Sequence, residues 1–258
     1  MKVTKNAIVT GAGRHKGIGA EVCRSLAKNG YNVFFTSFDE YDYQIANITK
    51  NDYIMTMNEC LNYGVKVFYE SYDLRYYDNI KQLFKEANNK LGTIDVLVNC
   101  ACYHVFDKLE TISEQLIDTN LEVNSKMTLL LCKEFYLNYR GQSGRIINLS
   151  STQNLESLTS EISYAISKAS VPIITTTLYP IMAEKGITIN AVNPGATDVD
   201  DINDNNIELY KKNNSFGRLG TPKDAANIIC FLISDKGKWI TGQTINSEGA
   251  LWRGLPKN

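Results

Sequence analysis

This sequence of 258 residues lacks an excess of either positive or negative charge. Its 27 Lys and Arg residues against 28 Asp and Glu residues leave a net charge of −1 at pH 7. Nucleic acids and acidic membrane surfaces are bound by basic surfaces, so we expect neither as a partner. Long hydrophobic runs are missing too: no stretch approaches the roughly 18 apolar residues of a membrane span. Glycines interrupt the short apolar run near the N-terminus, which does not fit a signal peptide, so we expect a cytoplasmic protein.

Histidine is scarce, and the cysteines are not arranged as metal ligands. The sequence has two His and six Cys residues, and the one close cysteine pair has C-x-C spacing, whereas zinc sites use C-x-x-C pairs or nearby histidines. No G-x-S-x-G turn frames a serine for a hydrolase. We therefore expect no metal site, and reduced thiols at Cys23, Cys60, Cys100, Cys102, Cys132 and Cys230.

Short apolar runs alternate with amphipathic segments along the chain. Most of the short runs are continuously apolar, which is typical of parallel strands buried on both faces. The predicted strands are 6–10, 32–36, 65–70, 94–99, 144–150, 187–192 and 242–247. The predicted helices between them are 17–29, 52–63, 76–91, 113–139, 161–184 and 222–234.

This alternation predicts an α/β fold, a doubly wound parallel sheet of seven strands with helices on both faces. We expect one domain over residues 1–258, with a nucleotide-binding half at about 1–110 and a catalytic and substrate half at about 111–258. Two polar stretches, 37–52 and 197–215, are predicted to be long loops, and the second is predicted to cover the substrate.

A glycine-rich turn follows the first predicted strand in "IVTGAGRHKGIGAEVC". Its glycines permit a tight turn and a close approach of ligand to backbone, and the helix that follows would direct its N-terminal N–H groups at a pyrophosphate. A P-loop does not fit, since Lys16 precedes the last glycines instead of following them. The turn predicts a dinucleotide site formed by Gly11, Gly13, Arg14, Gly17, Ile18 and Gly19.

The residues at the end of the second predicted strand bear on the choice of dinucleotide. An acidic residue there binds the ribose 2′-hydroxyl of NAD, but this chain has Ser37 near that point and Asp39 slightly late. Basic side chains, Arg14 among them, lie in the glycine turn and would suit a 2′-phosphate. We therefore expect NADP(H), with NAD(H) as the alternative.

Tyr164 and Lys168 lie four residues apart in "ISYAISKAS", on one face of a predicted helix. A phenol is a poor acid–base catalyst at neutral pH because its pKa is near 10, and a neighbouring ammonium favours the phenolate. Ser151 follows the fifth predicted strand, where ligands of α/β sheets bind, and its hydroxyl could hold a carbonyl oxygen.

The order of these motifs resembles the short-chain dehydrogenase/reductase superfamily over essentially the entire chain. The motifs are "TGAGRHKGIG", "LVNCAC", "INLSS", "YAISK", "NAVNPGATD" and "WITGQTINSEGA". Within that superfamily the sequence is most similar to enzymes like 3-oxoacyl-(acyl carrier protein) reductase. The resemblance implies a Rossmann fold and a nicotinamide cofactor.

The resemblance also implies a role for each matching residue. Tyr164 is similar to the general acid/base, and Lys168 to the residue that binds the nicotinamide ribose and lowers the tyrosine pKa. Ser151 matches the serine that orients the substrate, and Asn124 the asparagine that holds a water in the proton relay. The other implied cofactor contacts are Ser37, Asp73, Leu74, Asn99, Pro194, Gly195 and Thr197.

Three features depart from the common pattern of the family. The glycine turn has five residues between Gly11 and Gly17, a spacing similar to that of the enoyl reductases in the superfamily. Cys100 and Cys102 replace an asparagine and a glycine, and a thiol cannot reproduce the hydrogen bonds of an amide. The stretch "SEGA" replaces D-G-G near the end of the chain.

The sequence predicts an NADP(H)-dependent ketoreductase that acts on a small carbonyl compound or alcohol. An acyl thioester is one candidate for this substrate. Enoyl thioester reduction is an alternative, although Glu161 stands where enoyl reductases place a tyrosine, seven positions before Lys168. A dinucleotide-binding sensor or scaffold without catalysis is another. By resemblance we also expect a homotetramer or a homodimer that pairs the helices at 113–139 and 161–184.

Overall fold

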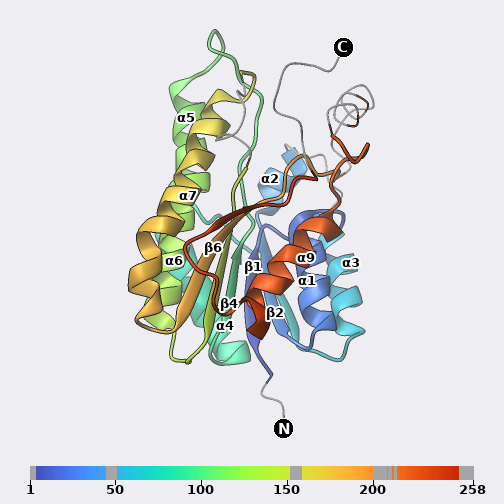
Figure 1. Ribbon diagram of the computed structural model, residues 1–258, viewed down its shortest axis with the longest axis vertical. Coiled ribbons are helices and arrows are strands. Elements are labelled where there is room, and N and C mark those ends of the chain that lie inside the picture. The colour runs from blue at the N-terminus through green and yellow to red at the C-terminus, as the bar shows by residue number, and fades with distance from the viewer. Residues whose placement is uncertain are drawn as a thin grey trace.

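A parallel sheet of seven strands forms the centre of the protein, as the sequence predicts (Figure 1). The computed structural model describes residues 4–44, 51–151, 159–199, 208, 211 and 214–249. The strand order is β3-β2-β1-β4-β5-β6-β7, and every neighbouring pair is parallel. The strands are β1 (Asn6–Thr10), β2 (Asn32–Ser37), β3 (Val67–Ser71), β4 (Val96–Asn99), β5 (Gly144–Leu149), β6 (Ile187–Asn193) and β7 (Thr244–Asn246).

Helices cover both faces of this sheet. On one side lie α1 (Ile18–Lys28), α3 (Asp52–Leu61) and α9 (Pro222–Ile233), and on the other α4 (Tyr77–Leu91), α6 (Thr128–Asn138) and α7 (Ile162–Ala183) (Figure 1). The remaining described helices are α2 (Asp39–Gln44), α5 (Glu114–Asn120), the π-helix η1 (Leu121–Met127) and the 3₁₀ helix η2 (Asp235–Gly237). These layers confirm the predicted doubly wound fold.

The continuous apolar runs of the strands supply two cores at once. Successive side chains of a strand point to opposite faces of the sheet. Ile8, Phe34 and Leu97 therefore pack under α4 and α6, while their neighbours Val9 and Phe35 pack under α1 and α9. All five side chains are fully buried. This is why the strands lack the polar alternation of a sheet with one wet face.

The order in which the chain adds strands to the sheet reverses between β1 and β4. Strand β1 has β2 on one side and β4 on the other, so the chain winds outward in both directions from this point. Ligands of open α/β sheets bind beyond the carboxyl ends of the strands at such a switch point. Here Thr10 and Asn99 are partners at the ends of β1 and β4.

The predicted boundaries of the strands and helices agree with the structure to within two residues. Two predictions need correction. The stretch 37–52 is not all loop, because it contains the six-residue helix α2. The helix predicted at 113–139 is divided into α5, η1 and α6, where the π-helix accommodates the buried Asn124. Much of the predicted loop at 197–215 lies outside the described residues.

Among the residues that the structure describes, no helix combines the length and the apolar composition needed to cross a membrane.

Leu97→Ala tests the packing of the central strand. Leu97 is fully buried on β4, so the loss of its side chain leaves a cavity under α4 and α6. We expect the free energy of unfolding in urea to fall by about 2–5 kcal/mol. Met55→Ala is the control, since Met55 on α3 is 52% exposed and its loss should change the stability by less than about 0.5 kcal/mol. Equal losses for both variants would contradict the assigned core.

Candidate active site

The glycine turn between β1 and α1 is tightly seated against neighbouring backbone. Gly11 has a φ of +68°, and a Cβ at this position would lie 2.4 Å from the Cα of Ala101. A Cβ on Gly19 would lie 2.4 Å from the carbonyl oxygen of Gly11, and one on Gly13 would lie 2.5 Å from the Cβ of Ser37. Each position therefore needs glycine, because any side chain would push the turn away from the sheet.

The N-terminus of α1 opens toward this turn. Gly17 is the N-cap residue and has no side chain to satisfy the first N–H groups of the helix, which begins at Ile18. Uncapped N–H groups behind a glycine turn suit a phosphate. The residues present thus fit the pyrophosphate of a dinucleotide, as the sequence predicts.

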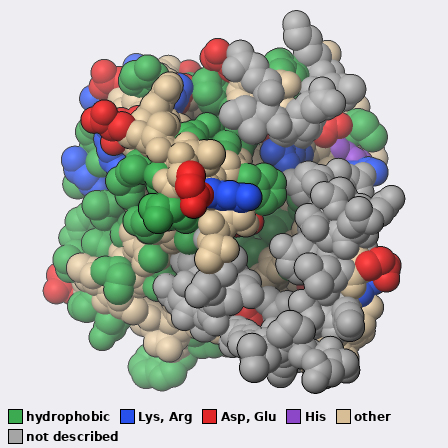
Figure 2. All heavy atoms as spheres, turned by 90° about the horizontal axis from the view of Figure 1, so that it is seen from above, with side chains coloured by type: hydrophobic (Ala, Val, Ile, Leu, Met, Phe, Trp, Pro, Cys, Tyr) green, Lys and Arg blue, Asp and Glu red, His purple; other side chains and the backbone are tan. Residues whose placement is uncertain are grey.

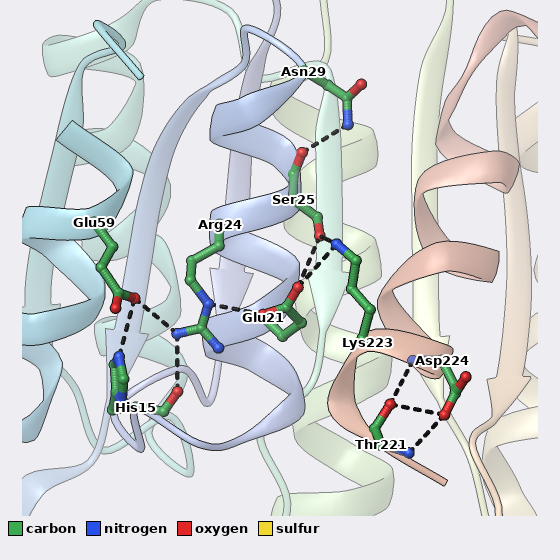
Figure 3. A network of polar contacts seen from close by, with 9 residues as sticks. All are labelled: His15, Glu21, Arg24, Ser25, Asn29, Glu59, Thr221, Lys223 and Asp224. Atoms are coloured by element: carbon green, nitrogen blue, oxygen red, sulfur yellow. Dashed lines mark hydrogen bonds and ion pairs between the residues drawn. The ribbon is translucent and has the colours of Figure 1, made fainter. Parts of the chain in front are cut away.

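Arg14 and His15 of the glycine turn each lie beside a carboxylate. The Arg14 guanidinium lies 3.7 Å from Asp42 of α2. The backbone N–H of His15 donates to Asp52 of α3. The His15 ring lies 3.0 Å from Glu59 of the same helix (Figure 3). A 2′-phosphate of NADP(H) would need basic side chains of the turn that are available to it, whereas Arg14 and His15 both have acidic partners.

Ser37, the residue expected at the ribose of the cofactor, lies in the same acidic surroundings. Its hydroxyl donates to Asp39 at 2.6 Å, at the point where α2 begins. The nearby Asp42 carboxyl is largely buried, and burial raises its pKa to about 6, partly offset by Arg14. Three carboxylates (Asp39, Asp42 and Asp52) line a small cavity of about 10 Å³ beside the glycine turn.

Helix α2 also reaches the other side of the switch point. Figure 1 shows it above the carboxyl ends of the strands. The Tyr41 hydroxyl accepts a hydrogen bond of 3.2 Å from the N–H of His104, and its ring lies 5.4 Å from that of Tyr103. Burial raises the pKa of Tyr41 to about 12. Tyr41 therefore joins the segment after β2 to the segment after β4.

Asn99, a predicted cofactor contact, is buried at the end of β4 and braces the sheet. Its amide donates to Asn148 of β5 at 2.8 Å, and Asn148 donates in turn to Thr175 of α7. The Oδ1 atom of Asn99 is buried and has no partner among the described residues. The N–H groups of Cys100 and Ala101 both donate to the Thr10 hydroxyl, so the altered "NCAC" segment keeps its backbone tied to β1.

Ser151, Tyr164 and Lys168 come together beyond the end of β5. A side-chain hydrogen bond joins Ser151 to Tyr164. The Lys168 ammonium is buried and donates to the carbonyl of Leu149 at 2.7 Å, which places it below the same strand end. The predicted serine, tyrosine and lysine thus share one site.

The protonation of Tyr164 differs from the expectation. Burial raises the pKa of the phenol, and the Cys102 thiol raises it further. Among the main influences on this pKa, only the hydrogen bond with Ser151 lowers it. The prediction that Lys168 makes the net pKa fall is therefore wrong for the chain on its own. The reason is that burial removes the water that stabilises a phenolate.

Asn124 lies on the π-helix and joins it to two other segments. Its amide exchanges two hydrogen bonds of 2.9 Å with the backbone of Tyr103, and it also donates to Ser167 and Asn120. Ser167 donates to the carbonyl of Tyr164. The amide of Asn124 therefore fixes the segment after β4 relative to the helix that carries the tyrosine.

A buried carboxylate that the sequence did not single out completes this arrangement. Asp107 is 2% exposed and accepts from both the N–H and the hydroxyl of Ser163 in the first turn of α7. Asn120 donates to the same hydroxyl at 2.8 Å. An anion at a helix N-terminus satisfies N–H groups and the helix dipole. Asp107 and Ser163 are 56 positions apart, so no local pattern in the sequence signals the pair.

The remaining predicted contacts lie at the same edge of the sheet. Asp73 follows β3 and is paired with Arg75 at 2.6 Å, and the neighbouring Leu74 is buried in the core under α4. Gly195 follows β6 with a φ of +67°, and Thr197 pairs with Gly220. The roles of these residues, with Pro194, at a cofactor stay predictions.

Two further observations concern cysteines and metals. All six cysteines are free thiols. In the described part of the chain, no three His, Cys, Asp or Glu side chains gather in a way that could hold a metal ion.

The chain and its fold are similar to those of known proteins. A family model described as "Enoyl-(Acyl carrier protein) reductase" matches residues 11–249. The chain is 36% identical to "Uncharacterized oxidoreductase YjdA" of Bacillus subtilis (strain 168), with 97% of this chain and 98% of that protein covered. It is 34% identical to 3-oxoacyl-[acyl-carrier-protein] reductase FabG of Staphylococcus aureus (strain Mu50), with 98% and 100% covered.

Solved structures give the same result. A short-chain dehydrogenase/reductase from Serratia marcescens superposes with a TM-score of 0.86 at 25% identity, covering 96% of this chain and 97% of that one. A blue fluorescent protein from a metagenomic library, in complex with NADPH, has a TM-score of 0.86 at 26% identity and the same coverage.

Asp107→Ala tests the brace at the start of α7. The change leaves the Ser163 N–H without its partner and removes the anion from the helix N-terminus. We expect the free energy of unfolding in urea to fall by about 1–3 kcal/mol. Asp118→Ala on the exposed face of α5 is the control and should change the stability little. An unchanged stability of the Asp107 variant would exclude the brace.

Proposed function

The chain belongs to the short-chain dehydrogenase/reductase superfamily and is an oxidoreductase of that type, and we propose that it interconverts a carbonyl group and an alcohol. The observation that carries this proposal is the hydrogen-bonded pair of Ser151 and Tyr164 beyond the carboxyl end of β5. FabG-like relatives support an acyl thioester as one form of the substrate. The proposed division of labour places the nucleotide in residues 1–110 and the chemistry in residues 111–258.

A bound nicotinamide dinucleotide would supply or accept the hydride. The glycine turn and the uncapped start of α1 are the groups that fit its pyrophosphate, with Gly11, Gly13, Gly17, Ile18 and Gly19 as the proposed contacts. The protein's own residues then hold the substrate and move the proton.

Tyr164 is proposed to donate the proton to the carbonyl oxygen during reduction. Because burial raises its pKa, the phenol stays protonated at neutral pH and is ready to donate. Ser151, hydrogen-bonded to the phenol, is placed to bond the same oxygen. For alcohol oxidation the phenolate is required, so the raised pKa favours reduction over oxidation at neutral pH.

Lys168 and Asn124 are proposed to support this step in different ways. An ammonium has three N–H donors, and Leu149 accepts from one of them, so further donors can serve the nicotinamide ribose and a proton relay. The Asn124 side chain is already bonded to Tyr103, Asn120 and Ser167. Its contribution to a relay is therefore to hold these segments in place.

NADP(H) is the proposed cofactor, supported by Arg14 beside the glycine turn and by the NADPH complex of a structural relative. NAD(H) is the second candidate, because the carboxylates of Asp39, Asp42 and Asp52 suit ribose hydroxyls better than a phosphate. The Arg14–Asp42 pair is then the group on which the choice depends, since a 2′-phosphate needs the guanidinium that Asp42 now holds.

Enoyl thioester reduction is a second candidate activity. The description of the matching family model and the long glycine turn favour it. Glu161 opposes it, because it stands seven positions before Lys168, where enoyl reductases place a tyrosine. Loss of absorbance at 340 nm with NADPH or NADH and a 3-oxoacyl thioester, but not with a crotonyl thioester, would identify ketoreduction. Tight cofactor binding without turnover of either would identify a sensor.

A dimer or tetramer is proposed from an apolar surface on four helical segments. Figure 2 shows hydrophobic side chains gathered on the side of the molecule where α5, η1, α6 and α7 lie. A monomeric protein rarely exposes so many large apolar side chains on one face. The exposed members are Ile117, Leu121, Leu129, Leu137, Ile166, Ile173 and Ile181.

Tyr164→Phe tests the proton donor. The variant keeps the ring and loses the hydroxyl, so we expect kcat for ketone reduction to fall about 10²–10⁴-fold while the Kd of the cofactor changes little. Tyr179→Phe is the matched control, because Tyr179 lies on the same helix and is 41% exposed. Wild-type turnover by the Tyr164 variant would show that another group donates the proton.

Asp42→Asn and Arg14→Ala test the choice of cofactor. Without the Asp42 carboxylate, Arg14 loses this ion pair and can meet a 2′-phosphate more readily, so we expect the affinity for NADPH relative to NADH to rise about 5–10-fold. Loss of Arg14 should lower the same ratio. Kd values from quenching of protein fluorescence measure it without any substrate.

Glu40→Gln serves as the control for these variants, since Glu40 is an exposed carboxylate of the same helix. Glu40→Gln should leave the ratio of NADPH to NADH affinity unchanged. If Asp42→Asn and Arg14→Ala leave it unchanged as well, the Arg14–Asp42 pair has no part in the selection.

A further inference from the structure

His104 and Glu161 form an ionisable pair directly beside Tyr164. The His104 Nε2 atom lies 3.3 Å from a carboxylate oxygen of Glu161. The imidazole meets the phenol ring of Tyr164 edge to face, with 4.7 Å between ring centroids and an interplanar angle of 76°. One ring is thus in contact with both the carboxylate and the phenol.

The position of this pair is fixed on both sides. His104 follows β4, and its backbone N–H donates to the Tyr41 hydroxyl. The centroid of its ring lies 5.2 Å from that of Phe106. Glu161 is the N-cap residue of α7, and its backbone pairs with that of Asp107 in an isolated parallel bridge. The two segments that carry the pair are therefore held together independently of the ion pair.

The charge of Glu161 acts on the phenol. Its carboxylate raises the pKa of Tyr164, as do Cys102 and Tyr41, after burial as the largest cause. An imidazolium at His104 would offset the carboxylate, because it lies against both groups. Lys168 adds positive charge from below the strand end. Among the residues that the structure describes, these five side chains are the titratable groups that we place around Tyr164.

We propose that His104 and Glu161 are positioning residues of the active site, in which the imidazolium neutralises the carboxylate beside the Tyr164 phenol and so adjusts its strength as a proton donor. This inference rests on the proposed function. It predicts that the two members of the pair have opposite effects: Glu161→Gln makes the phenol the stronger acid, and His104→Gln leaves the carboxylate unopposed and makes it the weaker acid. A pair that merely fastens the loop to the helix would give losses in the same direction.

The kinetic test uses the full-length protein with NADPH and saturating ketone at pH 6 and pH 9. At pH 6 we expect kcat to rise about two- to threefold in Glu161→Gln and to fall by a similar factor in His104→Gln, with the KM of the cofactor unchanged. Histidine side chains ordinarily lose their charge well below pH 9. If the charge of the imidazolium is what matters, the effect of His104→Gln should therefore disappear at pH 9.

Glu110→Gln is the control for loss of one negative charge, since Glu110 lies on the same loop and is exposed. It should leave kcat unchanged at both pH values. Parallel losses in both pair variants at pH 6, or an effect of His104→Gln that persists at pH 9, would overturn the proposal.

A second measurement does not depend on turnover. The chain has only two histidines, so His15→Gln assigns the imidazole signals in an NMR titration of the protein. We expect the His104 signals to titrate at lower pH in Glu161→Gln than in the wild type, and to lose a ring-current shift in Tyr164→Leu. If both responses appear but no ketone is reduced, the pair exists and the proposed function fails. If neither appears, the pair itself is wrong.

Discussion

The site depends on one buried network of hydrogen bonds that fastens the segment after β4 to the start of α7. Asp107 holds Ser163, Asn120 joins the same hydroxyl, and Asn124 connects Asn120 to the backbone of Tyr103. These polar groups are buried, so each bond that is lost leaves an unsatisfied donor or acceptor. The parallel sheet brings the strand ends to one edge, but this network decides how the side chains beyond the edge face one another.

The electrostatics of Tyr164 follow from that placement. The network sets the phenol in a partly buried position, next to Cys102 on one side and the His104–Glu161 pair on the other. Burial opposes ionisation more strongly than the hydrogen bond from Ser151 favours it. The chain on its own thus keeps the phenol protonated, which is the state that a proton donor needs. Charge at the neighbouring side chains then becomes the means by which the protein can adjust the donor.

At the other end of the site, charges of both signs meet around the glycine turn. Arg14 lies against the Asp42 carboxylate of α2. His15 and Arg24 both contact Glu59 of α3, and Arg24 also pairs with Glu21 (Figure 3). Pairing of this kind reduces the positive potential that basic residues of the turn would otherwise present. A count of cations in the sequence therefore overstates the attraction of the turn for a phosphate.

The amino-acid sequence by itself determined the fold and the outline of the site. The patterns that predicted them are local: continuous apolar strands, amphipathic helices, and the spacing of Gly11, Gly19, Tyr164 and Lys168. Each of these patterns determines structure through backbone geometry or helical periodicity. Helix α2 was missed because a six-residue segment rich in Asp and Tyr has no apolar face to signal it. The sequence also could not reveal that Lys168 bonds to Leu149 while burial raises the pKa of its tyrosine neighbour.

Tertiary structure alone decided the contacts between distant segments. Asp107 meets Ser163 across 56 positions, and Arg14 meets Asp42 through a helix that the sequence did not predict. His104 meets both Glu161 and Tyr164 in the same way. Such pairs form because the parallel strands deliver separate loops to one edge of the sheet, and no local periodicity specifies which side chains then come into contact. The residues of the site can thus be predicted from the sequence, whereas their charges and protonation states depend on burial and on partners that the fold brings next to them.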